Sequence, residues 1–395
     1  MNGPPRGPLR RGCGRRKTSE GFPVRLAAKV SLSVVLSPFF LSAQTTITPD
    51  FPRLNWQPTQ AISGVRYVGT TTCAKCHPAE AETQPSTPMA RAAEAVSKCE
   101  ILLAHPQLTS RDGAYRYEVV KNGPAAVFRV SDGTHEITEP ILFAFGQGEA
   151  GQTYIFKHHG VYIQSRISFF TDTQGLGRTL GASQAAPFSI EEAAGQPTSE
   201  SDARLCFGCH MTGSAQDGPL QLEELTPGVT CEGCHGPGEA HVAAFARGDV
   251  QTPTIFNPGK LATGDLLDFC GSCHRTAQMV ESLKMEGILN VRFQPYRLSN
   301  SRCFNPQDRR IGCLACHNPH RPRSRDDDSY DQACLACHKT SASAPATKDK
   351  LPRSCTVAAQ HCVGCHMPKY ELPGGHFKFT DHWIRVVRPK EIYPE

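Results

Sequence analysis

The stretch "TCEGCHGPGEAHV", Thr230 to Val242, contains two cysteines and two histidines in thirteen residues. Cys231 and Cys234 are followed directly by His235, and His241 lies six residues further on. Taken alone, this stretch fits a zinc site, a disulfide with unrelated histidines, or covalent attachment of a cofactor. The rest of the chain decides between these three interpretations.

The pattern C-x-x-C-H occurs seven times and uses fourteen of the eighteen cysteines in the 395 residues. Numbered along the chain, the motifs are Cys73-Cys76-His77, Cys206-Cys209-His210, Cys231-Cys234-His235, Cys270-Cys273-His274, Cys313-Cys316-His317, Cys334-Cys337-His338 and Cys362-Cys365-His366. Composition alone would give roughly 0.03 such motifs in this chain, so the repetition indicates a chemical requirement.

C-x-x-C-H is the attachment motif of c-type haem. One helical turn places cysteines at positions i and i+3 and histidine at i+4 on the same side, where two thioethers and one proximal imidazole can hold one porphyrin. Structural zinc uses two separated ligand pairs, which a histidine next to its cysteine fits poorly. The sequence therefore predicts seven covalently bound haem c groups, each with a proximal histidine.

The spacing of the motifs predicts how the chain is organised. Motifs 2 to 7 fall within residues 206–366, which leaves roughly 27 residues for each haem, too few for an ordinary side-chain core. We therefore expect a mainly α and irregular multihaem cytochrome c fold, organised around stacked haems. The short intervals 206/231 and 313/334 predict that these motif pairs hold neighbouring haems.

The segment between motifs 1 and 2 has a different pattern. "AYRYEVVKNGPAAVFRV" alternates apolar and polar residues around Asn122-Gly123, and a second hairpin is expected to turn at His158-His159-Gly160. The expected order is thus a motif-1 segment at 44–111, a small β-rich insertion at 112–172, a Gly- and Ser-rich linker at 173–200, and a six-haem domain at 201–395.

Residues 1–43 resemble a secretory signal, with eight basic residues, the apolar run "VSLSVVLSPFFL" and then Ser42-Ala43. The apolar run is too short to span a bilayer comfortably, so membrane contact is expected only in transit, and the protein is expected in the periplasm or otherwise exported. Without this segment the net charge of +5 falls to about −2, which gives no reason to expect nucleic acid as a partner.

A second axial ligand for each iron must come from outside the motifs. The stronger candidates follow motifs or lie in apolar surroundings: His241, His320, His376, His382 and His105. Weaker candidates, for which solvent exposure or packing is the simpler role, are His135, His158, His159, His361 and Met89. Five strong candidates for seven irons leave room for an open coordination position. Cys303 and Cys355 are candidates for a disulfide.

Four stretches carry a family resemblance: "YVGTTTCAKCHPAE" (67–80), "GVTCEGCHGPGEAH" (228–241), "CLACHNPH" (313–320) and "CVGCHMPK" (362–369) followed by "FTDHWIR" (379–385). Over about 67–385 the chain resembles multihaem c-type cytochromes of the doubled-CXXCH type. These are related to the tetrahaem electron carrier of ammonia oxidisers. The resemblance implies that His320, His376 and His382 are distal ligands. The lysine-ligated motif of the distantly related nitrite reductase is absent, which argues against that activity.

Three functions fit the sequence. The leading one is an exported electron-transfer protein whose redox partners, a donor and an acceptor, are unknown. The second is a reductase or oxidase of a small nitrogen or sulfur compound at one five-coordinate haem. The third is a module that docks on a partner reductase through the β-rich insertion. No further catalytic constellation is evident in the sequence, so catalytic residues remain unknown.

Overall fold

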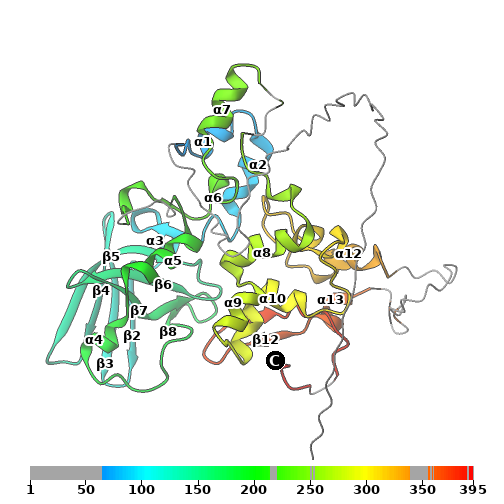
Figure 1. Cartoon of the computed structure of the whole chain (residues 1–395). Coiled ribbons are helices and arrows are strands. Elements are labelled where there is room, and N and C mark those ends of the chain that lie inside the picture. Colours follow the sequence, from blue (N-terminus) through cyan, green and yellow to red (C-terminus); the bar gives the residue numbers. More distant parts are fainter. Residues whose placement is uncertain are drawn as a thin grey trace, which may run out of the picture. The chain divides into compact units, whose positions relative to one another are not determined.

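The computed structural model describes residues 65–388 and 391–394, except 214–219, 250, 252–253, 339–354, 356–357 and 359. The predicted export segment 1–43 lies outside the described residues. Within them, no helix combines the length and the apolar character needed to cross a bilayer. The described chain combines an extended antiparallel sheet with many short helices (Figure 1).

The largest sheet has nine strands among the described residues. They are β1 (Ala93–Ala95), β2 (Gln107–Asp112), β3 (Tyr115–Asn122), β4 (Ala125–Ser131), β5 (Glu136–Phe145), β6 (Gln152–His158), β7 (Val161–Phe170), β8 (Gly175–Arg178) and β9 (Gly195–Thr198). Strands β2 to β8 pair in sequence order, while β1 pairs with β5 and β9 with β7, all antiparallel.

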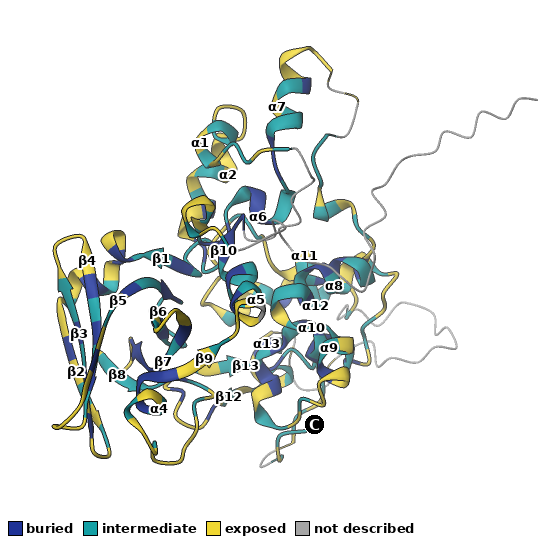
Figure 2. Cartoon of the chain, turned by 60° about the vertical axis from the view of Figure 1, so that its left-hand side comes forward, coloured by how far each residue is buried: buried dark blue, intermediate teal, exposed yellow. Residues whose placement is uncertain are grey.

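Alternation of side chains builds the core of this sheet. Tyr117 and Val119 of β3 and Phe128 of β4 are fully buried, and the Phe128 ring stacks on Phe156 of β6 at 4.6 Å between centroids. Figure 2 shows the buried residues following these strands. The two predicted hairpins are confirmed: Asn122 pairs with Ala125, and His158 pairs with Val161.

The predicted bounds of the β-rich region and the linker are wrong. The sheet runs from Ala93 to Thr198, beyond 112–172 at both ends, and residues 173–200 contain β8, helix α4 (Ile190–Ala194) and β9. The sequences of β8, "GLGR", and β9, "GQPT", have low strand propensity. They form strands because β7 supplies hydrogen-bonding partners for both.

Side-chain ion pairs connect β2 with β8, the first and last strands of the pairing order. Asp112, the last residue of β2, accepts hydrogen bonds from Arg178 Nη2 of β8 at 2.6 Å and from Arg166 Nε of β7 at 3.3 Å. The sheet therefore curls toward closure, with a half-buried ion-pair cluster across the gap.

Outside the sheet the chain forms short helices. The α-helices are α1 (Thr70–Cys73), α2 (Pro78–Thr83), α3 (Glu100–Ala104), α5 (Glu200–His210), α6 (Cys231–His235), α7 (Glu239–Ala246), α8 (Thr263–His274), α9 (Ala277–Ser282), α10 (Gln294–Ser299), α11 (Cys313–Cys316), α12 (Asp331–Leu335) and α13 (Cys362–His366). The 3₁₀ helices are η2 (Gln84–Ser86), η3 (Val96–Lys98), η4 (Leu222–Glu224), η5 (Pro258–Lys260), η6 (Ile288–Arg292), η7 (Arg309–Ile311) and η8 (Asp327–Tyr330). Two small hairpins complete the set, β10 (Met211–Thr212) with β11 (Thr226–Pro227) and β12 (Lys369–Glu371) with β13 (Lys378–Thr380).

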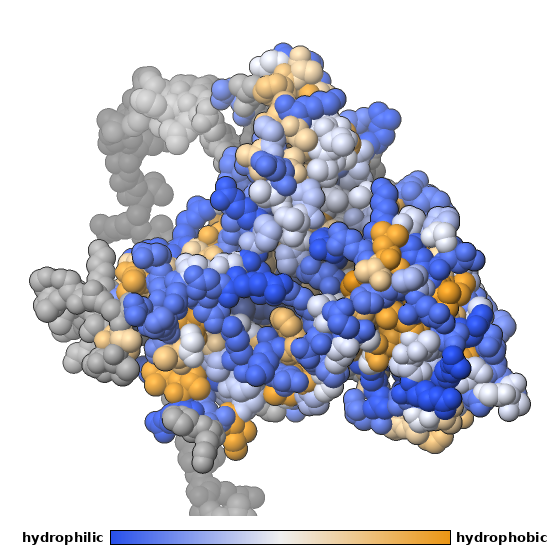
Figure 3. Space-filling model, turned by 180° about the vertical axis from the view of Figure 1, so that it is seen from behind, coloured by the Kyte–Doolittle hydropathy of each residue, from blue (hydrophilic) through white to orange (hydrophobic). Residues whose placement is uncertain are grey.

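The face seen in Figure 3 is largely hydrophilic, with apolar side chains in separate groups. The sheet region contains the larger of two side-chain cores found in the described chain, and the second joins β1, β5, β6 and β7 to α5. The helical region thus has far less apolar side-chain packing of its own than the sheet has.

Candidate functional site

Each of the seven motifs folds as a single helical turn. Motifs 2 and 4 form the last turns of α5 and α8, and motifs 3 and 7 are the helices α6 and α13 themselves. In the other three, the amide of His77, His317 or His338 donates to the carbonyl of the first cysteine of its motif at 2.9 Å. The local geometry expected from the spacing i, i+3, i+4 is therefore present at every motif.

The motif residues fit a covalent haem. None of the fourteen motif cysteines forms a disulfide, so their thiols are available for thioether bonds. The histidines have an independent signature, because Nδ1 of His210, His235 and His366 hydrogen-bonds a backbone carbonyl at 2.8–2.9 Å. An Nδ1–H that donates to a carbonyl leaves the Nε2 lone pair free to bind a metal.

Burial keeps four of the motif imidazoles in the form that ligates a metal. Desolvation lowers the pKa of His210, His235, His274 and His317 below the ordinary histidine value. A lowered pKa favours the neutral imidazole at pH 7, and neutral imidazole is the metal ligand.

Two predicted distal histidines lie opposite motif histidines. The ring of His320 is 6.1 Å from that of His235, with 11° between their planes. The ring of His382 is 6.3 Å from that of His317, at 39°. Two imidazoles that bind one metal from opposite sides, each at about 2.0 Å, have ring centroids roughly 6 Å apart.

His382 has the same hydrogen-bonding signature as the motif histidines. Its Nδ1 bonds to Thr380 O at 3.0 Å, and burial lowers its pKa to about 4. His320 is fixed through its backbone, since its carbonyl accepts a 2.6 Å hydrogen bond from Thr83 Oγ1 at the end of α2. The motif-1 segment therefore helps to hold His320 opposite His235.

The other three strong candidates make different contacts. The His105 ring lies 5.1 Å from Phe169, and the His376 ring lies 5.0 Å from Phe170, both on β7. His241, on α7, has Nδ1 3.3 Å from Thr254 Oγ1. These contacts place none of the three rings against a motif histidine.

Three of the weaker candidates are engaged with carboxylates. His135 contacts Asp132, His158 contacts Glu139 at 2.8 Å, and His361 contacts Asp328 at 2.6 Å. The suggested disulfide is not formed, because Cys303 retains a free thiol.

Thiols from different motifs lie within hydrogen-bonding range and so identify neighbouring motifs. The pairs are Cys73 with Cys231, Cys209 with Cys273, Cys270 with Cys313, and Cys334 with Cys362. Motifs 1 and 3, 2 and 4, 4 and 5, and 6 and 7 are therefore adjacent. Haems held at adjacent motifs would be close enough for electrons to pass between them.

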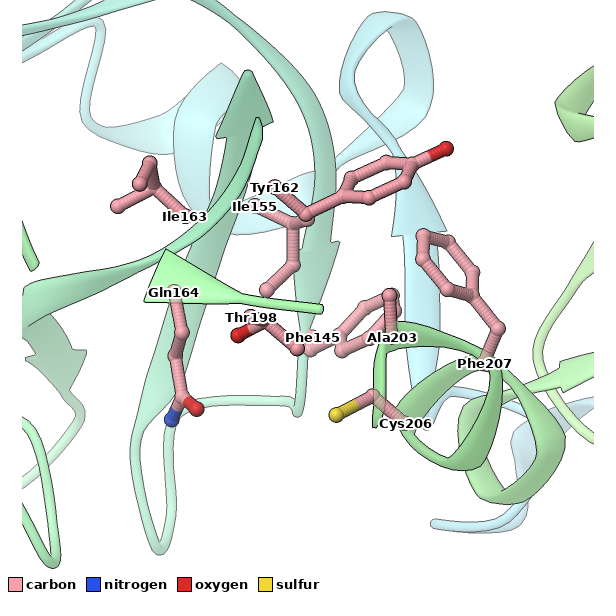
Figure 4. A pocket seen from close by; sticks show the side chains of 9 residues that line it. All are labelled: Phe145, Ile155, Tyr162, Ile163, Gln164, Thr198, Ala203, Cys206 and Phe207. Atoms are coloured by element: carbon pink, nitrogen blue, oxygen red, sulfur yellow. The ribbon is translucent and has the colours of Figure 1, made fainter. Parts of the chain in front are cut away.

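The sheet contributes directly to motif 2. The carbonyl of Ala92, just before β1, accepts the 2.8 Å hydrogen bond from His210, and Phe145 of β5 stacks on the His210 ring at 4.6 Å and 3°. A small apolar pocket beside these residues is lined by Cys206, Tyr162 and Phe207, among others; Figure 4 shows the Cys206 sulfur directed away from α5 toward the strands.

Several residues that organise the site gave no signal in the sequence. Glu232 and Asp331 are buried carboxylates that accept backbone N–H groups from other motif segments. Arg297 and Asp381 form a fully buried ion pair next to His382. Such residues could be found only from their three-dimensional contacts, because neither their spacing nor their type distinguishes them.

Comparison with known proteins gives one family match. Residues 178–236, which contain motifs 2 and 3, match the family model described as cytochrome c554 and c-prime. Neither the comparison with curated proteins nor that with solved structures gives a match. The family match agrees with the chemistry of the motifs and supports identification of the chain as a c-type cytochrome, with covalently bound haem c and a role in electron transfer.

Proposed function

We propose that this protein is an exported, periplasmic electron carrier with seven haems, one at each C-x-x-C-H motif. The fourteen motif cysteines would hold the porphyrins, and the seven motif histidines would be the proximal ligands. Bound haem supplies a one-electron Fe(III)/Fe(II) couple, and the chain sets its potential through axial ligands, burial and nearby charge. Its redox partners would be a donor and an acceptor protein.

The observation that carries this proposal is the pairing of imidazoles. His320 opposite His235 and His382 opposite His317 would give the third and fifth haems two histidine ligands each. An iron with both axial positions filled exchanges electrons without binding a substrate. The adjacent motifs supply a route through the helical region along which such centres would pass electrons.

Intact-mass spectrometry tests the number of haems, and a mass corresponding to fewer than seven would contradict the proposal. Electron paramagnetic resonance of the ferric protein tests the ligands. We expect His320→Ala and His382→Ala each to convert one low-spin centre to high spin.

His361→Ala is the matched control, because His361 also lies beside a motif but is engaged with Asp328 at the surface. It should leave every centre low-spin. Unchanged spectra in the His320 and His382 variants would refute the ligand pairing. A high-spin centre that binds carbon monoxide after reduction in the unmodified protein would instead favour an enzyme.

A further inference from the structure

Arg297 and Asp381 form an ion pair in which both side chains are fully buried. Nε of Arg297 donates to one carboxylate oxygen at 2.8 Å, and Nη2 donates to the other at 2.9 Å. Removing two charges from water is costly, and this cost is offset only where the pair has good geometry and further hydrogen bonds. The two-pronged bond therefore fixes α10, which carries Arg297, to the segment that contains Asp381.

The Arg297 guanidinium also organises the end of the chain. It lies 4.9 Å from the Trp383 ring and 4.6 Å from the Tyr393 ring, and its Nη1 donates to Pro394 O at 3.0 Å. Cation–π contacts of this kind are strongest when the cation is desolvated. Arg297 therefore contacts both the segment around Trp383 and the segment around Tyr393.

The residues beside His382 are fixed to the same part of the fold. Asp381 also accepts hydrogen bonds from the Trp383 amide at 3.0 Å and from Arg385 Nη1 at 2.8 Å. Ser301, just after α10, donates through Oγ to His382 O at 3.3 Å and accepts from the Ile384 amide at 2.8 Å.

The His382 side chain then has little freedom. Its backbone is tied on both sides, and its Nδ1 bonds to Thr380 O. The ring can still present Nε2, and it lies opposite His317 at 6.3 Å. Orientation of this ring is what binding to a metal requires.

We propose that Arg297 is a positioning residue that holds His382 as the second axial ligand of the haem at motif 5, through Asp381. This inference rests on the proposed function, in which His317 and His382 ligate the same iron. It assigns a role to a buried charge pair that the motif chemistry does not explain.

The test is Arg297→Met in the full haem-loaded protein. Asp381 would keep Arg385 and the Trp383 amide as partners, so the substitution leaves no isolated buried carboxylate. We expect one centre that is low-spin in the unmodified protein, that of motif 5, to become high-spin in paramagnetic resonance. Added imidazole should restore the low-spin signal, because it can fill the position that His382 no longer holds. A purely structural role would not give this rescue.

The matched control is Arg166→Met. Arg166 is also buried and also shares its partner, since Asp112 keeps Arg178. This variant should lower the melting temperature and leave all centres low-spin. If Arg297→Met prevents recovery of haem-loaded protein, Arg297→Lys replaces it with the same criterion, because lysine keeps the charge but cannot form the two-pronged bond.

The outcomes separate the two proposals. If His382→Ala leaves every centre low-spin, the ligand pairing itself is wrong. If His382→Ala gives a high-spin centre while the Arg297 variant stays low-spin and does not respond to imidazole, the pairing stands and the positioning role is overturned. High-spin signal in Arg166→Met as well would also overturn it, because any buried arginine would then have the same effect.

Discussion

At the scale of single residues, Glu232 connects two motifs. It lies between the cysteines of motif 3, is 2 % exposed, and accepts three backbone hydrogen bonds at 2.8 Å, from Val68, Gly69 and Gly238. Val68 and Gly69 directly precede α1, which carries the first cysteine of motif 1. A carboxylate is required here because it has acceptors on both oxygens and no hydrogen to donate.

We expect Glu232→Gln to destabilise the protein by about 1–3 kcal/mol. Glutamine has an NH2 group in place of one carboxylate oxygen, so a buried backbone N–H would face a donor and lose its acceptor. Thermal unfolding measures the loss, and faster hydrogen exchange at Val68 and Gly69 locates it.

The matched control is Glu239→Gln, at a carboxylate that also binds the 66–69 segment but at the surface, where it pairs with the exposed Arg66. An exposed pair of this kind is screened by water and contributes little to stability. Equal losses in the two variants would show that the burial of Glu232 has no special effect.

At the scale of elements, periodicity predicted the strands that have their own amphipathic pattern and missed those that do not. The β3–β4 and β6–β7 hairpins follow from alternation and turn residues, and the latter turn has positive φ at His159 and Gly160. β1 and β9 could not be predicted, because segments of three or four residues are too short to carry a periodic signal and become strands only where β5 and β7 offer partners.

Gly228 makes the closest backbone approach between elements at the site. Its φ is +81°, and a Cβ there would overlap the Ala90 carbonyl. Its amide donates to His210 O at 3.1 Å, and the next amide, of Val229, donates to Met89 O at 2.9 Å. The entry to α6 is therefore packed against both motif 2 and the segment before β1.

We expect Gly228→Ala to reduce the free energy of unfolding more than Gly248→Ala does. Gly248 has a similar φ of +78° but open space where a Cβ would lie. Both variants carry the cost of a left-handed alanine, about 1–2 kcal/mol. Only Gly228→Ala adds a clash with backbone, so its loss of unfolding free energy should exceed that of Gly248→Ala by at least about 1 kcal/mol. Denaturant unfolding measures both, and equal losses would contradict the close approach at Ala90.

At the scale of the whole molecule, the sequence identified the motif residues but only some of the neighbouring motifs. Short intervals predicted that motifs 2 and 3, and motifs 5 and 6, hold adjacent haems. Motifs 2 and 3 do adjoin, since the Gly228 amide donates to His210 O, and motifs 5 and 6 are close, since burial and the nearby Cys334 thiol raise the pKa of Cys316. Thiol contacts also join motifs 1 and 3, 2 and 4, 4 and 5, and 6 and 7, which the intervals do not single out. Adjacency in space depends on long-range contacts such as those of Glu232 and Asp331, which leave no periodic signal.

The candidate distal ligands show the same division. His320 and His382 lie opposite motif histidines because Thr83 and Ser301, distant in sequence, fix their backbones. His105 and His376 are equally among the stronger candidates from the sequence, yet their rings pack on β7. Whether a histidine reaches an iron is decided by the packing of other segments.

The distribution of side-chain cores predicts how the chain behaves without its cofactor. The larger cluster of buried apolar residues lies within Val96–Ala194, and in the described chain no comparable cluster is built from the helical region alone. The chain made without haem attachment should therefore keep its sheet and lose the fold of the motif helices.

Limited proteolysis of this haem-free chain should leave a protected fragment close to residues 93–198, identified by mass spectrometry, because these bounds enclose the nine-stranded sheet. The haem-loaded protein, treated in parallel, should keep larger fragments that include motifs 2 to 5. Cleavage within β3–β7 as fast as cleavage around the motifs would show that the sheet also needs the haems. Equal protection of both parts in the haem-free chain would show that the motif helices hold together without porphyrins, which would remove the reason for placing haem at their core.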